Sequence, residues 1–228
     1  MLIQRLFDDT PYIITHKSER IRIKDEFYPT NAKINFLCKS VTLTQKYQQP
    51  IIRPYEGTIP VHLCAIRKVK PNERKHNCGH FYNTDNQIER FWNRLPQYIS
   101  LFDQFHSVIG IDLSCTEEMP TDAKRWNCFR NKLFVAYLQY HNVSVIPNIS
   151  WWSDVDWNWC LDGLPKHSVI AINSTGLRTN PHSKKIWIEG YKRVIDMLEP
   201  ITIIRYGAKQ KGECESISFY YPNDNERR

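Results

Sequence analysis

From residue 58 onward, short apolar runs alternate with segments of helical periodicity, and this alternation constrains the possible folds more than any other feature. Runs of β-branched and aliphatic residues predict buried strands, and apolar residues spaced three and four apart predict helices. The predicted strands are 59–66, 107–113, 143–147, 169–173 and 201–205. The predicted helices are 85–102, 122–141 and 183–198. Pro96 should bend or split the first helix, and Thr121 or Asp122 should cap the second.

The order of these elements predicts an α/β fold: a mostly parallel sheet of about five βα units, forming a partial barrel or an open sheet. An irregular N-terminal extension of residues 1–57 carries short β-like runs at 21–23, 34–37 and 41–43. We expect this extension to pack on the core domain, which spans residues 58–215. Residues 216–228 should add one alternating strand and then a mobile, charged tail.

Polar residues follow four of the predicted strands directly. The carboxyl ends of parallel strands lie at one edge of a sheet, so we expect these side chains to line a ligand pocket there. The alternative is that these residues only terminate the strands, because every strand must end in something polar. The candidate ligand-binding residues are Ser114, Asn148, Ser150, Trp151, Trp152, Asn173, Thr175, Arg205 and Tyr206.

Two carboxylates near this edge are candidates for acid–base chemistry, Asp112 and Asp154. Asp112 stands between two aliphatic residues, where partial desolvation raises the pKa of a carboxyl group toward a useful value. Alternatively, Asp112 only accepts hydrogen bonds from amides of the loop that follows it. Asn127 and Asn131 share one face of the second helix, and the sequence favours a solvated face for them over a place at the rim.

Four tryptophans, Trp151, Trp152, Trp157 and Trp159, follow the strand at 143–147. Indole rings stack on bases, on sugars, or on each other within a core. Adjacent side chains in a loop rarely point the same way, so one of Trp151 and Trp152 should pack inward. We expect most of these rings in the core and at least one exposed at the rim.

A net charge of +7 makes an anionic partner plausible, and nucleic acid is the commonest one. The alternative is that this moderately basic charge only keeps the protein soluble. The candidate nucleic-acid contacts are Lys68, Lys70, Arg74 and Lys75. Seven scattered cysteines without a CxxC pair favour free thiols in a reducing cytoplasm. Neither a membrane span nor a signal peptide is indicated. No nucleotide-loop, zinc-protease or serine-hydrolase motif occurs, and no cofactor is expected.

The segment His76, Cys78 and His80 is a weak candidate for a metal site. Alternate residues of a strand project to one face, so these three side chains could reach one ion. A fourth ligand is not evident nearby, and the default expectation is that no metal binds.

The segments CGHFYNTD, VIGIDLSCTEEMPTDAKRWNCFRN, VSVIPNISW and AINSTG resemble, in this order, a bacterial and phage family catalogued as domain of unknown function four-four-one-seven. The resemblance covers about residues 60 to 207 and implies an origin in phages, mobile elements or bacterial genomes. Leu113 stands where an aromatic residue is expected in relatives. The family pattern falls on His80, Phe81, Asp112, Ser114, Met119, Pro120, Asn127, Asn148, Trp151, Thr175 and Gly176.

Three functions follow from these observations. The first is a phage or mobile-element protein, in the cytoplasm of a bacterial host, that binds nucleic acid or a nucleotide-like anionic ligand at the rim. The second is an enzyme with a rim pocket that uses Asp112 as general acid or base. The third is a virion or host-interaction protein without catalysis. The oligomeric state is open.

Overall fold

The computed structural model describes residues 30–116, 118–152, 157–175 and 181–221. The chain divides into two compact units, Met1–Ser40 and Val41–Arg228. The described part of the first unit holds helix α2 (Thr30–Cys38). This helix overturns the β-like run predicted at 34–37, because four residues are too few for β propensity to decide the local structure. All elements named below belong to the second unit.

The described residues contain seven strands, and every paired couple among them is parallel. Neighbours in the sheets follow sequence order, with β1 to β4 in one sheet and β5 to β7 in another. A parallel bridge between Asn148 and Ala171 joins the end of β4 to β5. The predicted α/β fold with a parallel sheet is confirmed. The strands are β1 (Leu63–Ala65), β2 (Cys78–His80), β3 (Ser107–Ile109), β4 (Val145–Ile146), β5 (Val169–Asn173), β6 (Thr202–Tyr206) and β7 (Ser218–Tyr221).

The strands curl around a common interior. One buried cluster contains residues from six successive strands: Leu63, Cys78, Ile109, Ile146, Ala171 and Ile204. The rings of His80 in β2 and Tyr206 in β6 have centroids only 4.6 Å apart. In a flat sheet, strands four places apart would be separated by about 19 Å, at about 4.8 Å per strand. The arrangement is therefore a partial barrel, not a flat open sheet.

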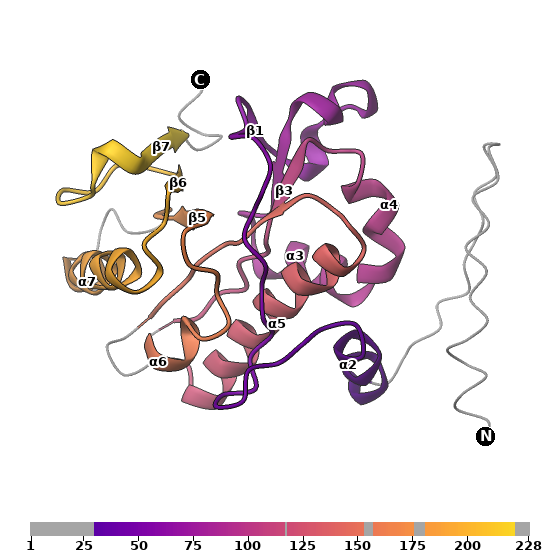
Figure 1. The fold of residues 1–228 in the computed structure, drawn as a ribbon, viewed down its shortest axis with the longest axis horizontal. Helices are drawn as coiled ribbons and strands as arrows, with labels where there is room; N and C mark the ends of the chain where they lie inside the picture. Colours follow the sequence, from indigo (N-terminus) through magenta and orange to yellow (C-terminus); the bar gives the residue numbers. More distant parts are fainter. Residues whose placement is uncertain (1–29, 117, 153–156, 176–180, 222–228) are drawn as a thin grey trace. The chain divides into compact units, whose positions relative to one another are not determined.

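Helices cover the outside of this curled sheet. Figure 1 shows α7 on the side of β5 and β6, α6 next to the lower end of α5, and α3 and α4 on the side of the earlier strands. Pro96 splits the first predicted helix into three pieces, as expected. No described helix is long and apolar enough to cross a membrane. The helices are α3 (Asp85–Asn93), α4 (Ile99–Phe102), α5 (Thr121–Tyr140), α6 (Trp157–Cys160) and α7 (Pro181–Leu198), with short 3-10 turns η1 (Ile66–Lys68), η2 (Pro71–His76), η3 (Leu95–Tyr98) and η4 (Glu215–Ile217).

The N-terminus of α5 differs from the prediction. Its cap position is Pro120, which offers no side-chain hydrogen bond to the first turn. Asp122 lies inside the helix, largely exposed, with its carboxylate 3.8 Å from the guanidinium of Arg125. The predicted side-chain cap at Thr121 or Asp122 is therefore wrong, because the proline allows the helix to begin at Thr121 itself.

Alternate residues of the strands pack on two sides of the sheet. In β5, Ala171 faces the interior, whereas Ile170 and Ile172 pack against Trp187 and Tyr191 of α7. On the other flank of the partial barrel, Phe81 makes edge-to-face contacts with three phenylalanines of α3, α4 and α5. Both faces of the central strands are thus buried, which explains their nearly continuous apolar sequence.

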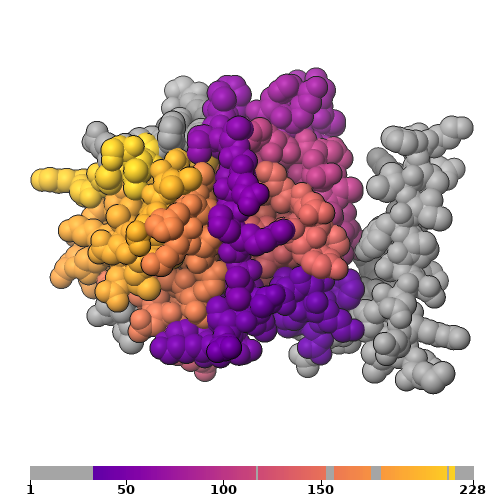
Figure 2. Space-filling view, in the orientation of Figure 1, coloured from indigo at the N-terminus to yellow at the C-terminus, as the bar shows by residue number. Residues whose placement is uncertain are grey.

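Residues 41–62 cross the amino ends of the strands and form the dark band over the face seen in Figure 2. The backbone N–H of Tyr55 donates to Ser168 Oγ, directly before β5 (2.9 Å), and Thr58 Oγ1 lies 2.9 Å from His106 Nε2, directly before β3. The Tyr55 ring is buried in the interior cluster. This segment covers the amino end of the interior and leaves the carboxyl ends of the strands uncovered by it.

Candidate functional site

The carboxyl ends of the central strands bring polar side chains together at one edge of the sheet. Because β2 to β6 are parallel, the residues that end or follow them share that edge. Five of these side chains form a connected hydrogen-bonded set, which we call the rim cluster: Tyr82, Asp112, Asn148, Ser150 and Asn173. Asn148 is buried and the other four are half-buried, so solvent reaches part of the cluster.

Asp112 is the centre of the rim cluster. Its Oδ1 accepts a hydrogen bond of 2.6 Å from Ser150 Oγ, and its Oδ2 accepts one of 3.2 Å from Asn173 Nδ2. Asn148 Nδ2 donates to Ser150 Oγ at 3.2 Å, and the Tyr82 hydroxyl donates to Asn148 Oδ1 at 2.8 Å. The network therefore connects the ends of four strands, β2 to β5, through side chains alone.

The environment of Asp112 favours its protonated form. Burial raises the pKa of the Asp112 carboxyl above its ordinary value, while hydrogen bonds from Ser150, Asn173 and Asn148 oppose the rise and the carboxylate of Asp85 adds to it. A carboxyl group with a raised pKa holds its proton more firmly than a solvated aspartate and is a better general acid or base. The chemistry available here is proton transfer or hydrogen bonding to a polar ligand.

Three rings lie against this network. Tyr82 and Tyr206 stack with centroids 4.6 Å apart and planes 20° apart, and His80 lies 4.6 Å from Tyr206. The backbone N–H of Tyr82 donates to Nδ1 of His80 at 3.2 Å, so that nitrogen is the acceptor of the imidazole. Burial raises the pKa of the Tyr82 hydroxyl well above its ordinary value, so it remains a hydrogen-bond donor.

Helix α5 positions the loop that carries Asp112. Asn131 Oδ1 accepts a hydrogen bond of 3.0 Å from the Leu113 N–H, and Asn127 Nδ2 donates one of 2.6 Å to the Ser114 carbonyl. Both asparagines are buried, which overturns the expected solvated face. Their amides replace the hydrogen bonds that the loop backbone lacks where β3 has ended.

Arg205 lies outside the rim cluster, in contrast to the prediction. It alternates with Tyr206, so its side chain leaves β6 on the opposite face, toward α7. There its Nε lies 3.0 Å from the Glu213 carboxylate, and both side chains are fully buried. Its guanidinium also stands 4.7 Å from the centre of the Trp187 ring. Arg205 therefore joins β6, α7 and the loop that follows β6.

The adjacent tryptophans pack away from Asp112. Trp151 is buried, donates from Nε1 to the Trp187 carbonyl at 3.1 Å, and lies on Gly190 of α7. Trp152 is half-buried and stacks with Trp159 at 6.1 Å. One of the two adjacent rings thus points inward, and both extend the cluster between β5, α6 and α7.

The remaining rim candidates support the cluster from its edges. Thr175 donates from its backbone N–H and its hydroxyl to Asn173 Oδ1, both at 2.8 Å, which turns the amide nitrogen of Asn173 toward Asp112. Ser114 instead donates twice to the Asp85 carboxylate of α3. Asp154 and Gly176 lie outside the described residues.

The predicted metal candidate does not assemble. His76 is exposed at the end of η2, whereas Cys78 and His80 are buried in β2, so the three residues do not share one face of a strand. Within the described residues, no group of three histidine, cysteine or acidic side chains is placed to hold a metal ion. The thiol of Cys78 lies in the apolar interior, and its burial raises its pKa to about 12. No disulfide bond is present among the cysteines of the described residues.

The predicted nucleic-acid contacts lie in η1, η2 and the connection between them. Lys68, Lys70 and Lys75 are exposed, and Arg74 is half-buried with Nη1 2.6 Å from Gln104 Oε1. None of the four side chains belongs to the rim cluster. The basic segment and the carboxylate centre are therefore separate features of the structure.

Tyr82 and Asp85 take part in the site but were not identified from the sequence. Strand β2 has only three residues, CGH, and lacks the apolar run that marks the other strands. Without that strand, nothing placed Tyr82 at the rim. The available signal was the alternation of His80 and Tyr82, which would place both side chains on one face of an extended chain.

Comparison with known proteins gives a family but no function. A family model described as Domain of unknown function (DUF4417) matches residues 43–220. The Gene 1 protein of Mycobacterium phage L5 is 27% identical over 189 residues, which cover 80% of this chain and 81% of the phage protein. The Gene 1 protein of Mycobacterium phage D29 is 26% identical over 164 residues, covering 71% of this chain and 60% of that protein. No solved structure shows significant similarity.

Proposed function

This chain belongs to the DUF4417 family and is similar to the Gene 1 proteins of two mycobacteriophages, and we propose that its rim cluster binds the nucleoside portion of a nucleotide or nucleic-acid strand. The observation that carries the proposal is the hydrogen-bonded network of four polar side chains around Asp112 at the carboxyl ends of parallel strands. Barrels of parallel strands bind their ligands at this edge.

The chemistry of the rim cluster suits a ligand group that is itself uncharged. Asp112 offers carboxylate oxygens, and Asn148, Ser150 and Asn173 offer amides and a hydroxyl. A phosphate at this position would meet the carboxylate of Asp112, which repels it. Ribose hydroxyls and base amino groups are donors that a carboxylate accepts, and the net charge of +7 attracts the phosphates attached to them.

The position of Asp112 also favours a second candidate function, proton-transfer catalysis on the bound ligand. Its carboxyl has a raised pKa and a short hydrogen bond to the Ser150 hydroxyl. Such a group can give a proton to a leaving group or take one from a nucleophile. In this function Asp112 is the acid or base, and Asn173 and Ser150 orient it.

Calorimetric titration of the full chain at about 50 mM salt, where charge contacts are strong, tests the proposal. The ligands are nucleoside monophosphates and short single-stranded oligonucleotides. Asp112→Asn keeps the side-chain shape, since the amide oxygen can accept from Asn173 and the amide nitrogen can donate to Ser150 Oγ. We expect this variant to bind at least about tenfold more weakly, because a hydrogen bond to a charged group is lost.

The matched control is Asp122→Asn, which removes an exposed carboxylate of α5 and should leave binding unchanged. Wild-type affinity in Asp112→Asn, or no binding of any of these ligands by the wild type, would contradict the proposal. A product formed by the wild type and absent with Asp112→Asn would support the catalytic candidate.

A further inference from the structure

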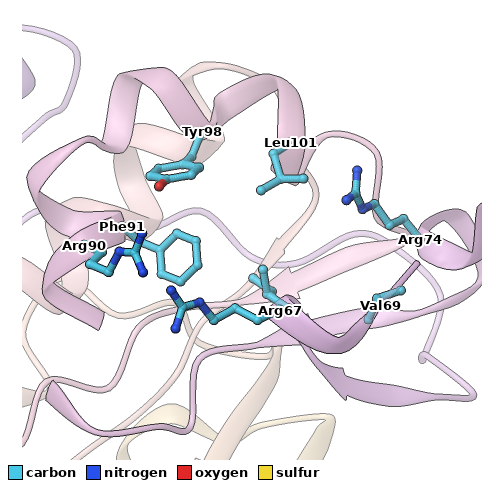
Figure 3. A pocket seen from close by; sticks show the side chains of 8 residues that line it. Arg67, Val69, Arg74, Arg90, Phe91, Tyr98 and Leu101 are labelled. Carbon is cyan, nitrogen blue, oxygen red and sulfur yellow. The ribbon is translucent and has the colours of Figure 1, made fainter. Parts of the chain in front are cut away.

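A second polar feature lies apart from the rim cluster, in a cavity of about 210 Å³ between the η1–η2 segment and the α3–η3–α4 stretch (Figure 3). At about 30 Å³ per water molecule, this volume equals about seven waters, which is enough for a phosphate group with part of an attached sugar. The cavity is lined by Ile66, Arg67, Val69, Arg74, Arg90, Phe91, Tyr98 and Leu101.

Three arginines line this cavity without a carboxylate among the lining residues. In Figure 3, Arg67 and Arg90 reach toward the end that holds Phe91, and Arg74 stands at the opposite end. Within the described residues, none of the three guanidiniums forms an ion pair. The hydrogen bond of Arg74 is to a neutral amide, that of Gln104.

Arg74 differs from an ordinary solvated arginine. Its Nε is buried and has no hydrogen-bond partner among the described residues. A buried donor without a partner costs free energy, and a ligand acceptor would remove that cost. Its guanidinium also lies 5.9 Å from the centre of the Phe105 ring, which fixes the position of the side chain.

The other walls of the cavity are rigid. Val69 and Phe91 are buried, and Tyr98 makes an edge contact with Phe91 at 4.9 Å and a stacked contact with Phe102 at 5.8 Å. Partial enclosure by apolar side chains lowers the local dielectric constant, so like charges repel more strongly and an anion is attracted more strongly than at an open surface.

We propose that the cavity lined by Arg67, Arg74 and Arg90 is a phosphate-binding site for a phosphate group of a nucleotide or of a nucleic-acid strand. Guanidinium groups form paired hydrogen bonds with phosphate oxygens, and this cavity offers two of them at one end and a third at the other. The exposed Lys68, Lys70 and Lys75 extend the positive surface for further phosphates of a strand.

Fluorescence anisotropy with a labelled single-stranded oligonucleotide, and calorimetry with a nucleoside triphosphate and with inorganic phosphate, test this site. Arg67 and Arg90 are both exposed, so the double variant Arg67→Gln/Arg90→Gln should fold with an unchanged melting temperature. We expect its affinity for the oligonucleotide to fall about 100-fold, since each lost charged hydrogen bond costs about tenfold. The slope of log affinity against log salt should become less steep by about 0.7, the value for one phosphate contact on a single strand.

The control variant is Arg125→Gln, which removes the same charge from an exposed position on α5 and should change affinity less than about twofold. Loss of triphosphate binding alone in the double variant identifies a nucleotide site, and loss of oligonucleotide binding identifies a strand site. Unchanged affinity for both ligands overturns the proposal. Asp112→Asn should retain the dependence on Arg67 and Arg90, so failure of the rim proposal and failure of this one are distinguishable.

Discussion

The hydroxyl of Ser150 lies 2.6 Å from Oδ1 of Asp112 and donates a hydrogen bond to it, although the two residues are 38 positions apart in the sequence. The parallel pairing of β3 with β4 brings the two strand ends together. This contact, with that from Asn173 of β5, fixes a partly desolvated carboxyl where an α/β barrel binds its ligands. The proposed binding of a nucleoside at the rim cluster depends on this carboxyl.

The pKa of Asp112 makes a prediction about stability against pH. A folded-state pKa above the unfolded value of about 3.9 means that the native state favours the protonated form. The contribution of Asp112 to stability is therefore fully present below about pH 3.9 and is lost as the pH rises through the folded-state pKa. Relative to Asp112→Asn, the wild type should lose unfolding free energy as the pH rises from about 3.9 through the folded-state pKa, as measured by urea denaturation. A difference that stays constant or grows with pH would contradict a raised pKa.

The buried pair of Arg205 and Glu213 should be essential for folding stability. In Glu213→Gln the guanidinium of Arg205 remains buried without its counter-charge, and we expect a loss of about 3–5 kcal/mol in urea denaturation. The control is Glu199→Gln, which breaks the exposed pair with Lys166 and should cost less than about 1 kcal/mol. Equal losses of unfolding free energy in the two variants would show that burial does not make the Arg205–Glu213 pair more important than an exposed pair.

Asn131→Ala should loosen the loop that carries Asp112. The variant leaves the Leu113 N–H and carbonyl without their side-chain partner in a buried place, at a cost of about 1–3 kcal/mol. Hydrogen exchange at the Leu113 amide should accelerate while exchange in β5 stays slow. Asn158→Ala, at an exposed position of α6, is the control and should be neutral. Unchanged protection of Leu113 would mean that Asn131 does not hold this loop.

Gly190→Ala should destabilise the protein even though alanine is the better helix former. The added methyl group would collide with the indole of Trp151, which is held by its hydrogen bond to the Trp187 carbonyl. Overpacking costs about 1–3 kcal/mol, against a gain in helix propensity of about 1 kcal/mol. Denaturation followed by tryptophan fluorescence measures the net loss, and Lys192→Ala on the exposed face of α7 is the control. A more stable Gly190→Ala protein would show that the indole can move away freely.

The sequence predicted the fold class well because its longer elements have clear periodicity. Helix α5, helix α7 and strands β5 and β6 each carry enough apolar residues for the pattern to be unambiguous. Strand β2 was not predicted, because its three residues, one of them Gly79, are too few to show a periodicity. The break at Pro96 was predictable from the covalent structure of proline alone.

The sequence predicted only those parts of the candidate site that follow from the order of the strands. The parallel order of the strands was enough to place Asp112, Asn148, Ser150, Asn173 and Tyr206 at one edge. The sequence could not show that Arg205 leaves β6 on the other face, because that depends on the register of β6 against its neighbours. The buried roles of Asn127 and Asn131 depend on a tertiary contact with the loop after β3, which helical spacing does not reveal.

The most direct test of the rim proposal is the carbon-13 NMR signal of the Asp112 carboxyl, assigned by its absence in Asp112→Asn, during titration with a nucleoside monophosphate and a single-stranded oligonucleotide. We expect this signal in the free protein to titrate above the ordinary pKa of about 3.9, and to shift as ligand is added with the same saturation curve as binding measured by calorimetry. A carboxyl that titrates at or below about 3.9, and whose signal stays unmoved while the ligand binds, would contradict the rim proposal.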